Sequence, residues 1–168
     1  TTKWGIIKSA ALSIVILGVI MWGIIPGVII VAGWFELLFV NGFGMPFNTG
    51  VVIYALLLIA GLTFGIRYTL KHNHTVVNTI LTCFVVMLIG YSCYAMVVIR
   101  SVSNPPIDEN SPDNVFALLS YISRDQYGQE PLVYGPYFNA PVIGVEDAGP
   151  IYYQNEKTGK YDIVDHKK

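Results

Sequence analysis

The chain has 168 residues, of which 54% are hydrophobic and only 12% are charged, against about 25% charged in an ordinary soluble domain. Its net charge of −1 averages two unlike halves, because residues 1–100 carry five basic residues and one acid, whereas residues 101–168 carry five basic residues and ten acids. This distribution predicts a membrane region followed by an acidic extramembrane segment, and it excludes nucleic acid as an expected partner.

Three long uncharged runs in the first 100 residues predict membrane-spanning helices. A helix needs about 20 mostly apolar residues to cross about 30 Å of hydrocarbon. The predicted spans cover residues 6–25, 48–67 and 76–99. The expected fold class is a mainly α membrane protein with about three transmembrane helices, an interfacial helix and a small α+β extramembrane segment.

The end of the first span is marked by Pro26 and Gly27, where we expect the helix to break or kink. The stretch GVIIVAGWFELLFV that follows predicts an interfacial helix over residues 27–40. Its Trp34 and Glu36 give the mixture of aromatic rings and a single charge that suits the depth of lipid headgroups.

The orientation of the spans follows from basic residues at their ends. Lys3 and Lys8 begin the first span, and the turn at 67–75 holds further basic and histidine side chains. Cytoplasmic loops are enriched in Lys and Arg, so these ends are predicted to face the cytoplasm. Residues 101–168 then lie on the opposite, periplasmic side of a bacterial inner membrane.

The extramembrane segment starts with SNPPIDENSP, whose prolines end the third span and act as a rigid elbow. Ser111 is a favourable N-cap and Pro112 suits the first helical position, so we expect a helix over residues 112–126 that Gly128 ends. Strands follow, and PIYYQNEKTGKYDIV predicts a hairpin within residues 149–164.

Few side chains in this sequence suggest chemistry. Glu36 is the one acid of the first half, and it is either functional or simply close enough to the interface to reach water. Asp108 and Glu109 lie at the mouth of the third span, either as substrate or metal contacts or as solvated loop acids. His72 and His74 are two residues apart and do not converge on a helix, so no metal site is predicted.

The stretches SNPPIDENSPDNVFALLSYISRDQYGQEPLVYGPYFNAPV and KHNHTVVNTILTCFVVMLIGYSCYAMVVIRS resemble protein O-mannosyltransferase-like membrane proteins of Gram-negative bacteria, which belong to the GT-C class of glycosyltransferases. The likeness extends over about residues 5–142. It implies a polytopic inner-membrane enzyme that moves a sugar from a polyprenyl-phosphate donor to a periplasmic protein or glycan acceptor. No further cofactor is implied, and a divalent metal is left open.

The family's catalytic Trp-Asp-x-Gly-Glu type motif does not occur in this sequence. We therefore expect the chain to be an interior piece of a longer enzyme that transfers no sugar by itself. The resemblance and the position of the residues suggest two sets of candidates. The catalytic candidates are Asp108, Glu109 and Glu36, and the substrate-binding candidates are Asn110, Arg124 and Tyr127.

The alternative function is a membrane-anchored scaffold without enzymatic activity. Its extramembrane segment is rich in tyrosine, which is enriched at protein interfaces and sugar-binding surfaces. Such a segment would bind a periplasmic partner or a glycan.

Overall fold

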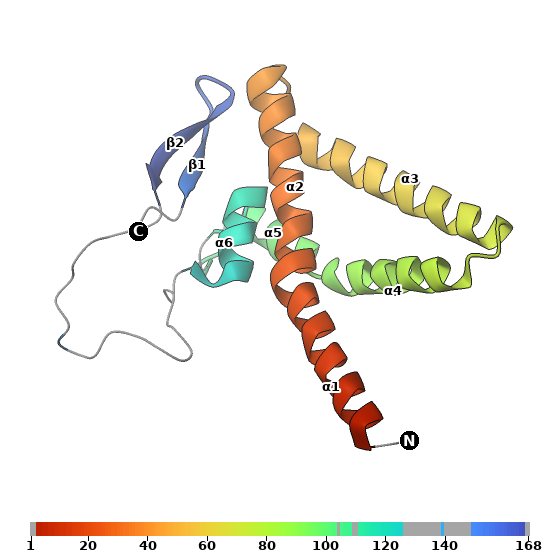
Figure 1. Ribbon diagram of the computed structural model, residues 1–168. Coiled ribbons are helices and arrows are strands. Elements are labelled where there is room, and N and C mark those ends of the chain that lie inside the picture. Colours follow the sequence, from red (N-terminus) through yellow and green to blue (C-terminus); the bar gives the residue numbers. More distant parts are fainter. Residues whose placement is uncertain (1–2, 104, 109–110, 126–138, 140–148, 167–168) are drawn as a thin grey trace.

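The computed structural model describes residues 3–103, 105–108, 111–125, 139 and 149–166. Within these residues the protein is mainly helical, with one two-stranded sheet. Three helices are long and apolar enough to cross a membrane: Lys3–Gly42, Thr49–Lys71 and Thr75–Val102. Figure 1 shows the first as a central rod, with the second and the start of the third on one side of it, the end of the third behind it, and the remaining helix and the sheet on the other side.

The central rod consists of four consecutive helical segments. These are α1 (Lys3–Gly18), the π-helical segment η1 (Val19–Ile24), α2 (Ile25–Leu37) and the π-helical segment η2 (Leu38–Gly42). At 1.5 Å per residue the rod is about 60 Å long, which is twice the thickness of the hydrocarbon core of a bilayer.

The helix continues through Pro26, so the predicted break between residues 6–25 and 27–40 does not occur. The reason is η1, in which the amide of Ile25 donates to the carbonyl of Ile20, five residues earlier. Pro26 then falls in the first turn of α2, where its missing N–H is tolerated and its fixed φ suits the helix. The two predicted elements are therefore one rod.

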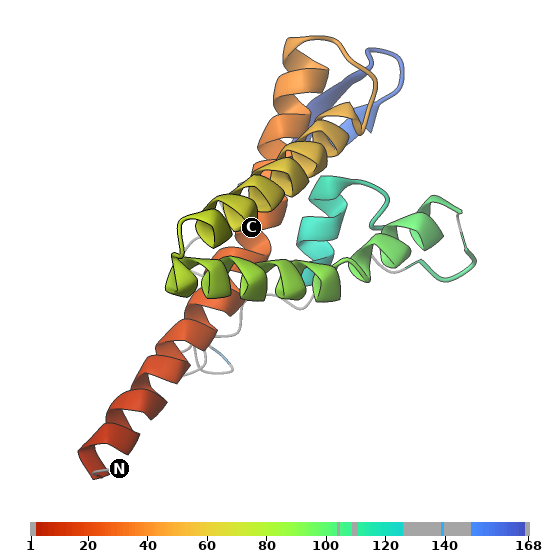
Figure 2. The same ribbon diagram turned by 90° about the vertical axis from the view of Figure 1, so that its right-hand side faces the viewer.

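The second and third apolar helices form an antiparallel helical hairpin. Helix α3 (Thr49–Lys71) begins one residue after the start predicted for the second span and continues four residues beyond the predicted end. Helices α4 (Thr75–Tyr91) and α5 (Tyr94–Val102) follow with a short turn between them, and α5 ends where the prolines of the elbow predict. Figure 2 shows α3 and α4 joined by their tight turn.

Small and polar side chains hold α3 and α4 together. Gly65 allows Leu81 of α4 to approach, since a Cβ at Gly65 would lie 3.2 Å from the Leu81 Cδ1 atom. Asn78 of α4 donates a hydrogen bond of 2.9 Å to the hydroxyl of Thr69, which is buried. Gly61, one turn before Gly65 on the same helix, has no atom within 4 Å of the position where its Cβ would lie.

Helix α6 (Val115–Ser123) is shorter at both ends than the predicted helix at 112–126. Its N-cap is Asn114, whose Oδ1 accepts hydrogen bonds from the amides of Phe116 and Ala117 at 3.0 and 2.9 Å. The prediction of Ser111 as the cap was wrong because Ser111 has a positive φ of 37° and lies outside the helix.

The C-terminal end of α6 also differs from the prediction. Arg124 adopts the left-handed conformation, with φ of 56°, and so ends the helix after Ser123. Gly128, the residue predicted to end it, lies outside the described residues.

The predicted hairpin is confirmed. Strand β1 (Pro150–Asn155) pairs antiparallel with β2 (Lys160–His166), and Asn155 pairs with Lys160 across the turn. Gly159 closes the turn with φ of 65°, and its amide donates to the carbonyl of Asn155 at 2.8 Å. In Figures 1 and 2 the hairpin lies beside the C-terminal end of the central rod.

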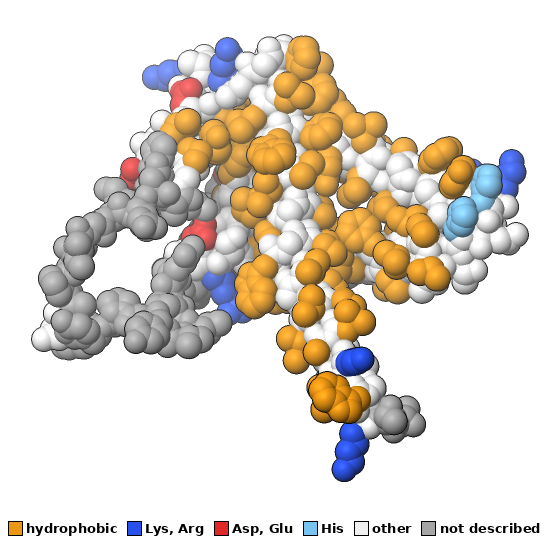
Figure 3. Space-filling model, in the orientation of Figure 1, with side chains coloured by type: hydrophobic (Ala, Val, Ile, Leu, Met, Phe, Trp, Pro, Cys, Tyr) orange, Lys and Arg blue, Asp and Glu red, His pale blue; other side chains and the backbone are white. Residues whose placement is uncertain are grey.

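The surface of the long helices is apolar. Large side chains on them are widely exposed, for example Trp22 at 79%, Phe64 at 71% and Val76 at 74%. Figure 3 shows these hydrophobic side chains along the rod and the helical hairpin, with Lys and Arg gathered at the free end of α1 and, together with His, at the turn between α3 and α4. Exposed apolar area of this extent is typical of a surface that contacts lipid or another protein.

The cap of α6 can be tested by substitution. We expect Asn114→Ala to destabilise α6 by about 0.5–2 kcal/mol, because the amides of Phe116 and Ala117 lose their acceptor. Hydrogen exchange at these two amides measures the effect. Ser111→Ala is the matched control and is expected to leave their exchange unchanged, and equal effects of the two substitutions would contradict the assignment of the cap.

Candidate functional site

Glu36 lies at the centre of a buried cluster of hydrogen bonds. It is on α2, and its side chain has no exposed surface. Its Oε1 accepts hydrogen bonds from the amide of Asn48 at 2.5 Å and from the hydroxyl of Tyr161 at 3.1 Å. Its Oε2 accepts from the amide of Val51 at 3.1 Å. One carboxylate therefore joins three parts of the chain.

Two of these bonds cap the N-terminus of α3. The first amides of a helix have no partner within the helix, and the helix dipole favours a negative charge beside them. Asn48 is at the N-cap position of α3, but its own side chain makes no capping hydrogen bond. Glu36 supplies that function from a different helix, which explains how an acid can be buried in this apolar half of the chain.

The close approach of α2 and α3 depends on Gly50. A Cβ atom at this position would collide with the carbonyl oxygen of Phe35 and with the backbone of Glu36. These neighbours are backbone atoms that cannot move aside cheaply. Gly50 therefore lets the N-terminus of α3 come within hydrogen-bonding distance of the Glu36 carboxylate.

Asn41 binds the backbone of Tyr161. Its Nδ2 donates to the Tyr161 carbonyl at 2.9 Å, and its Oδ1 accepts from the Tyr161 amide at 2.8 Å. A side-chain amide thus makes the pair of bonds that a neighbouring strand would make with β2. Asn41 lies in η2, where the five-residue hydrogen-bond repeat turns residue 41 towards the face of the rod that carries Glu36.

The ring of Tyr161 is enclosed by other aromatic rings. Phe47 and Phe116 approach it edge-on, with centroid distances of 5.2 and 5.1 Å, and Phe116 also packs against Tyr152 at 4.6 Å. Only 3% of Tyr161 is exposed. The Tyr161 hydroxyl donates to Glu36 and accepts from Gln154 Nε2 at 2.9 Å, so both of its hydrogen-bonding roles are satisfied.

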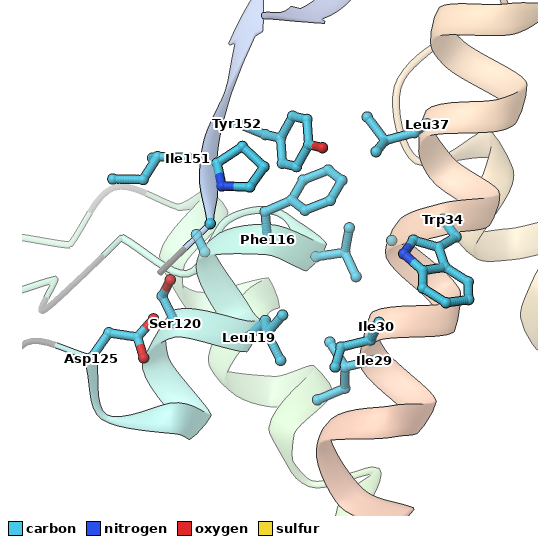
Figure 4. A pocket seen from close by; sticks show the side chains of 15 residues that line it. Ile29, Ile30, Trp34, Leu37, Phe116, Leu119, Ser120, Asp125, Ile151 and Tyr152 are labelled. Atoms are coloured by element: carbon cyan, nitrogen blue, oxygen red, sulfur yellow. The ribbon is translucent and has the colours of Figure 1, made fainter. Parts of the chain in front are cut away.

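An apolar pocket of about 680 Å³ lies next to this cluster, between α2, α6 and β1. Figure 4 shows Ile30 and Trp34 of α2 facing Phe116 and Leu119 of α6, with Tyr152 of β1 above them. Ser120 of α6 and Asp125, two residues after the end of that helix, contribute polar atoms to the pocket wall. Its volume and its mostly apolar lining are typical of a small-molecule or lipid-chain site.

The structure places the predicted site residues as follows. Glu36 is buried in the cluster described above. Asp108 accepts a hydrogen bond of 2.6 Å from Ser101, which closes the elbow after α5. Arg124 is exposed at the end of α6, next to a residue of the pocket wall. Glu109, Asn110 and Tyr127 lie outside the described residues.

The predictions missed the partners of Glu36. Asn41, Phe47 and Gly50 are in a stretch that reads as a turn, and Tyr161 is one of 11 tyrosines. No local pattern connects Asn41 with Tyr161, which is 120 residues further along the chain. The one signal in the sequence was that Glu36 is the only acid in the first 100 residues.

Within the described residues, no group of three or more His, Cys, Asp or Glu side chains could hold a metal ion. The ring of His72 stacks on Tyr68, with centroids 4.2 Å apart, and lies 6.3 Å from that of His74.

Comparison with protein-family models, with curated proteins and with solved structures found no match to this chain.

Removal of the Glu36 charge should destabilise the corner between α2 and α3. In Glu36→Gln one acceptor oxygen becomes an NH₂ donor that faces backbone amides, so we expect a loss of about 1–3 kcal/mol in the free energy of unfolding. Thermal unfolding in detergent measures the loss, and amide exchange at Asn48 and Val51 locates it. Glu156→Gln, in the exposed hairpin turn, is the control, and equal stability of the two variants would contradict this role of Glu36.

The docked hairpin should weaken at alkaline pH. Burial raises the pKa of the Tyr161 phenol above its ordinary value of 10.0, and the Glu36 carboxylate raises it further, against the opposing effect of the Gln154 hydrogen bond. The folded state thus holds the proton more tightly than the unfolded state, so this contribution to stability is complete below pH 10 and falls as the pH rises above it. Tyrosinate absorbance is measured as a function of pH in wild type and in Tyr161→Phe, and the difference between the two curves is the titration of the Tyr161 phenol. A midpoint of this difference curve at or below pH 10 would refute the expectation.

Proposed function

We propose that this chain is the membrane-embedded part of a glycosyltransferase of the GT-C class, which transfers a sugar from a polyprenyl-phosphate donor to a periplasmic protein or glycan acceptor. The observation that carries the proposal is the position of the apolar pocket. One of its walls belongs to a rod of membrane length, and the other walls are α6 and β1 of the predicted extramembrane segment. A lipid-linked sugar needs such a junction, because its chain is apolar and its head is charged.

In this proposal the pocket takes part of the polyprenyl chain against Ile30, Trp34 and Leu119. Arg124, exposed beside the pocket wall, is the side chain suited to the phosphate, since guanidinium groups bind phosphate oxygens through paired hydrogen bonds. Asp108 remains a candidate for acceptor or sugar contact. Glu36 is not proposed as the base, because both of its oxygens are engaged by donors and the side chain is buried.

The proposed orientation keeps residues 101–168 in the periplasm and the turn at 67–75 in the cytoplasm. The positions of the contacts support it. The hairpin docks beside the N-terminus of α3, whereas the basic turn lies at the opposite end of this 23-residue helix. At 1.5 Å per residue α3 is about 35 Å long, enough to separate the two sides of a bilayer.

A second candidate function is the scaffold without enzymatic activity. The structural roles of two candidate acids favour it, since Glu36 caps α3 and Asp108 accepts a bond from Ser101. Tyr153, which is 66% exposed on the hairpin, would then belong to a partner-binding surface.

Photolabelling distinguishes the two functions. We expect a polyprenyl phosphate with a diazirine on its terminal isoprene unit to label α2, α6 or β1 of the chain reconstituted in vesicles. Leu119→Trp fills the pocket and should reduce this labelling several-fold, whereas Leu118→Trp, the neighbouring control outside the pocket lining, should not.

Excess unlabelled polyprenyl-phosphate sugar should compete with the probe for these peptides. Labelling that is confined to α1, α3 and α4, as for any bilayer lipid, or that is unchanged in Leu119→Trp, would refute lipid-donor binding in the pocket and would favour the scaffold.

A further inference from the structure

The C-terminal hairpin is held against the helices by Tyr161. In the part of the chain that the structure describes, Tyr161 makes three hydrogen bonds from the hairpin to the rod: two through its backbone to Asn41 and one through its hydroxyl to Glu36. Its ring also contacts Phe47 and Phe116. An isolated two-stranded hairpin is marginally stable in water, so the position of this one depends on its docking.

The same hairpin forms a wall of the pocket. Pro150, Ile151 and Tyr152 of β1 line the side opposite α2. Strand β1 is paired with β2 along its whole length, and β2 carries Tyr161. Movement of Tyr161 away from the rod would therefore carry β1 with it and open the pocket.

The Glu36 carboxylate connects the hairpin to the membrane helices. Its Oε1 accepts hydrogen bonds from both the Tyr161 hydroxyl and the Asn48 amide, while its Oε2 accepts one from the Val51 amide. When Tyr161 leaves, the carboxylate loses a donor in a buried setting and rearranges or draws in water. The donors that remain are the first amides of α3, so the change reaches that helix directly.

We propose that the β1–β2 hairpin is a lid over the pocket, that Tyr161 is its latch, and that the shared Glu36 carboxylate couples opening of the lid to the N-terminus of α3. Such coupling is reciprocal, so a ligand that holds the lid closed also stabilises the start of α3. The inference concerns the docking of the hairpin alone and does not depend on the proposed glycosyltransferase function.

The experiment measures lid position and coupling separately. Spin labels are placed at Leu38 on the rod and Lys157 in the hairpin turn, both exposed, after both free cysteines are replaced by serine. Pulsed electron paramagnetic resonance on the chain in lipid nanodiscs then gives the distribution of distances. For the wild-type protein we expect a single narrow distribution of distances between the two labels.

Two variants release the latch in different ways. Asn41→Ala removes the backbone contacts and leaves Glu36 in place, whereas Tyr161→Phe removes only the hydroxyl. Each should add a longer-distance population. In Tyr161→Phe, which loses a charge-assisted hydrogen bond, we expect the open-to-closed ratio to rise roughly ten- to hundredfold. In Asn41→Ala, which loses neutral hydrogen bonds, we expect a rise of roughly tenfold or less for each bond. Tyr153→Phe, an exposed position on the same hairpin, is the matched control and should match wild type.

The coupling is measured by amide exchange at Asn48 and Val51. Exchange should be faster in Tyr161→Phe and unchanged in Tyr153→Phe. Distance distributions that are identical in wild type, Asn41→Ala and Tyr161→Phe would overturn the lid. An open population in Tyr161→Phe without faster exchange at the two amides would overturn the coupling through Glu36.

Discussion

The buried carboxylate of Glu36 is the constraint on which the arrangement of the described residues depends. A charge without exposed surface is costly unless hydrogen-bond donors surround it, and here the donors come from the start of α3 and from the hairpin. The two backbone amides fix α3 relative to α2, and the Tyr161 hydroxyl fixes the strand pair. The rod, the helical hairpin and the strand pair therefore all contact one carboxylate, and Gly50 is the residue that lets α3 come close enough to reach it.

The rod adapts to this site through local changes of helical register. The π-helical segment η1 accommodates Pro26 without ending the helix, and η2 brings Asn41 towards the backbone of Tyr161. Both changes leave the helix intact and alter only the direction in which particular side chains point. The rod can therefore be continuous over 40 residues and still present two polar side chains to one docking surface.

Local patterns in the sequence predict most of the secondary structure. Uncharged runs of membrane length, the prolines after Arg100 and the hairpin around NEKTGK all correspond to elements of the structure, because each depends on residues close together in the chain. The errors arose where two local signals compete. Pro26 is compatible with either a break or a π-helical segment, and Ser111 and Asn114 are both good caps, so only the packed structure decides between them.

The site was predictable only in part. A lone acid in an apolar half of the chain marked Glu36 as unusual, but its role depends on Tyr161, 125 residues away, and on a glycine that serves close packing. Such pairings are set by the tertiary fold and have no local signature. The sequence alone therefore left a functional acid and a water-exposed acid equally open, whereas the structure shows a buried capping acid.

The paired hydrogen bonds between Asn41 and Tyr161 also affect whether a strand of another chain can pair with the edge of this hairpin. The outer edge of a β-strand offers unpaired N–H and C=O groups on which another strand can grow, and natural proteins usually protect such edges. Here one side-chain amide occupies both groups of Tyr161, the second residue of β2, on the outer edge of the strand. An incoming strand cannot pair with that residue without displacing Asn41, so the contact that docks the hairpin also protects the turn end of this edge against edge-to-edge pairing.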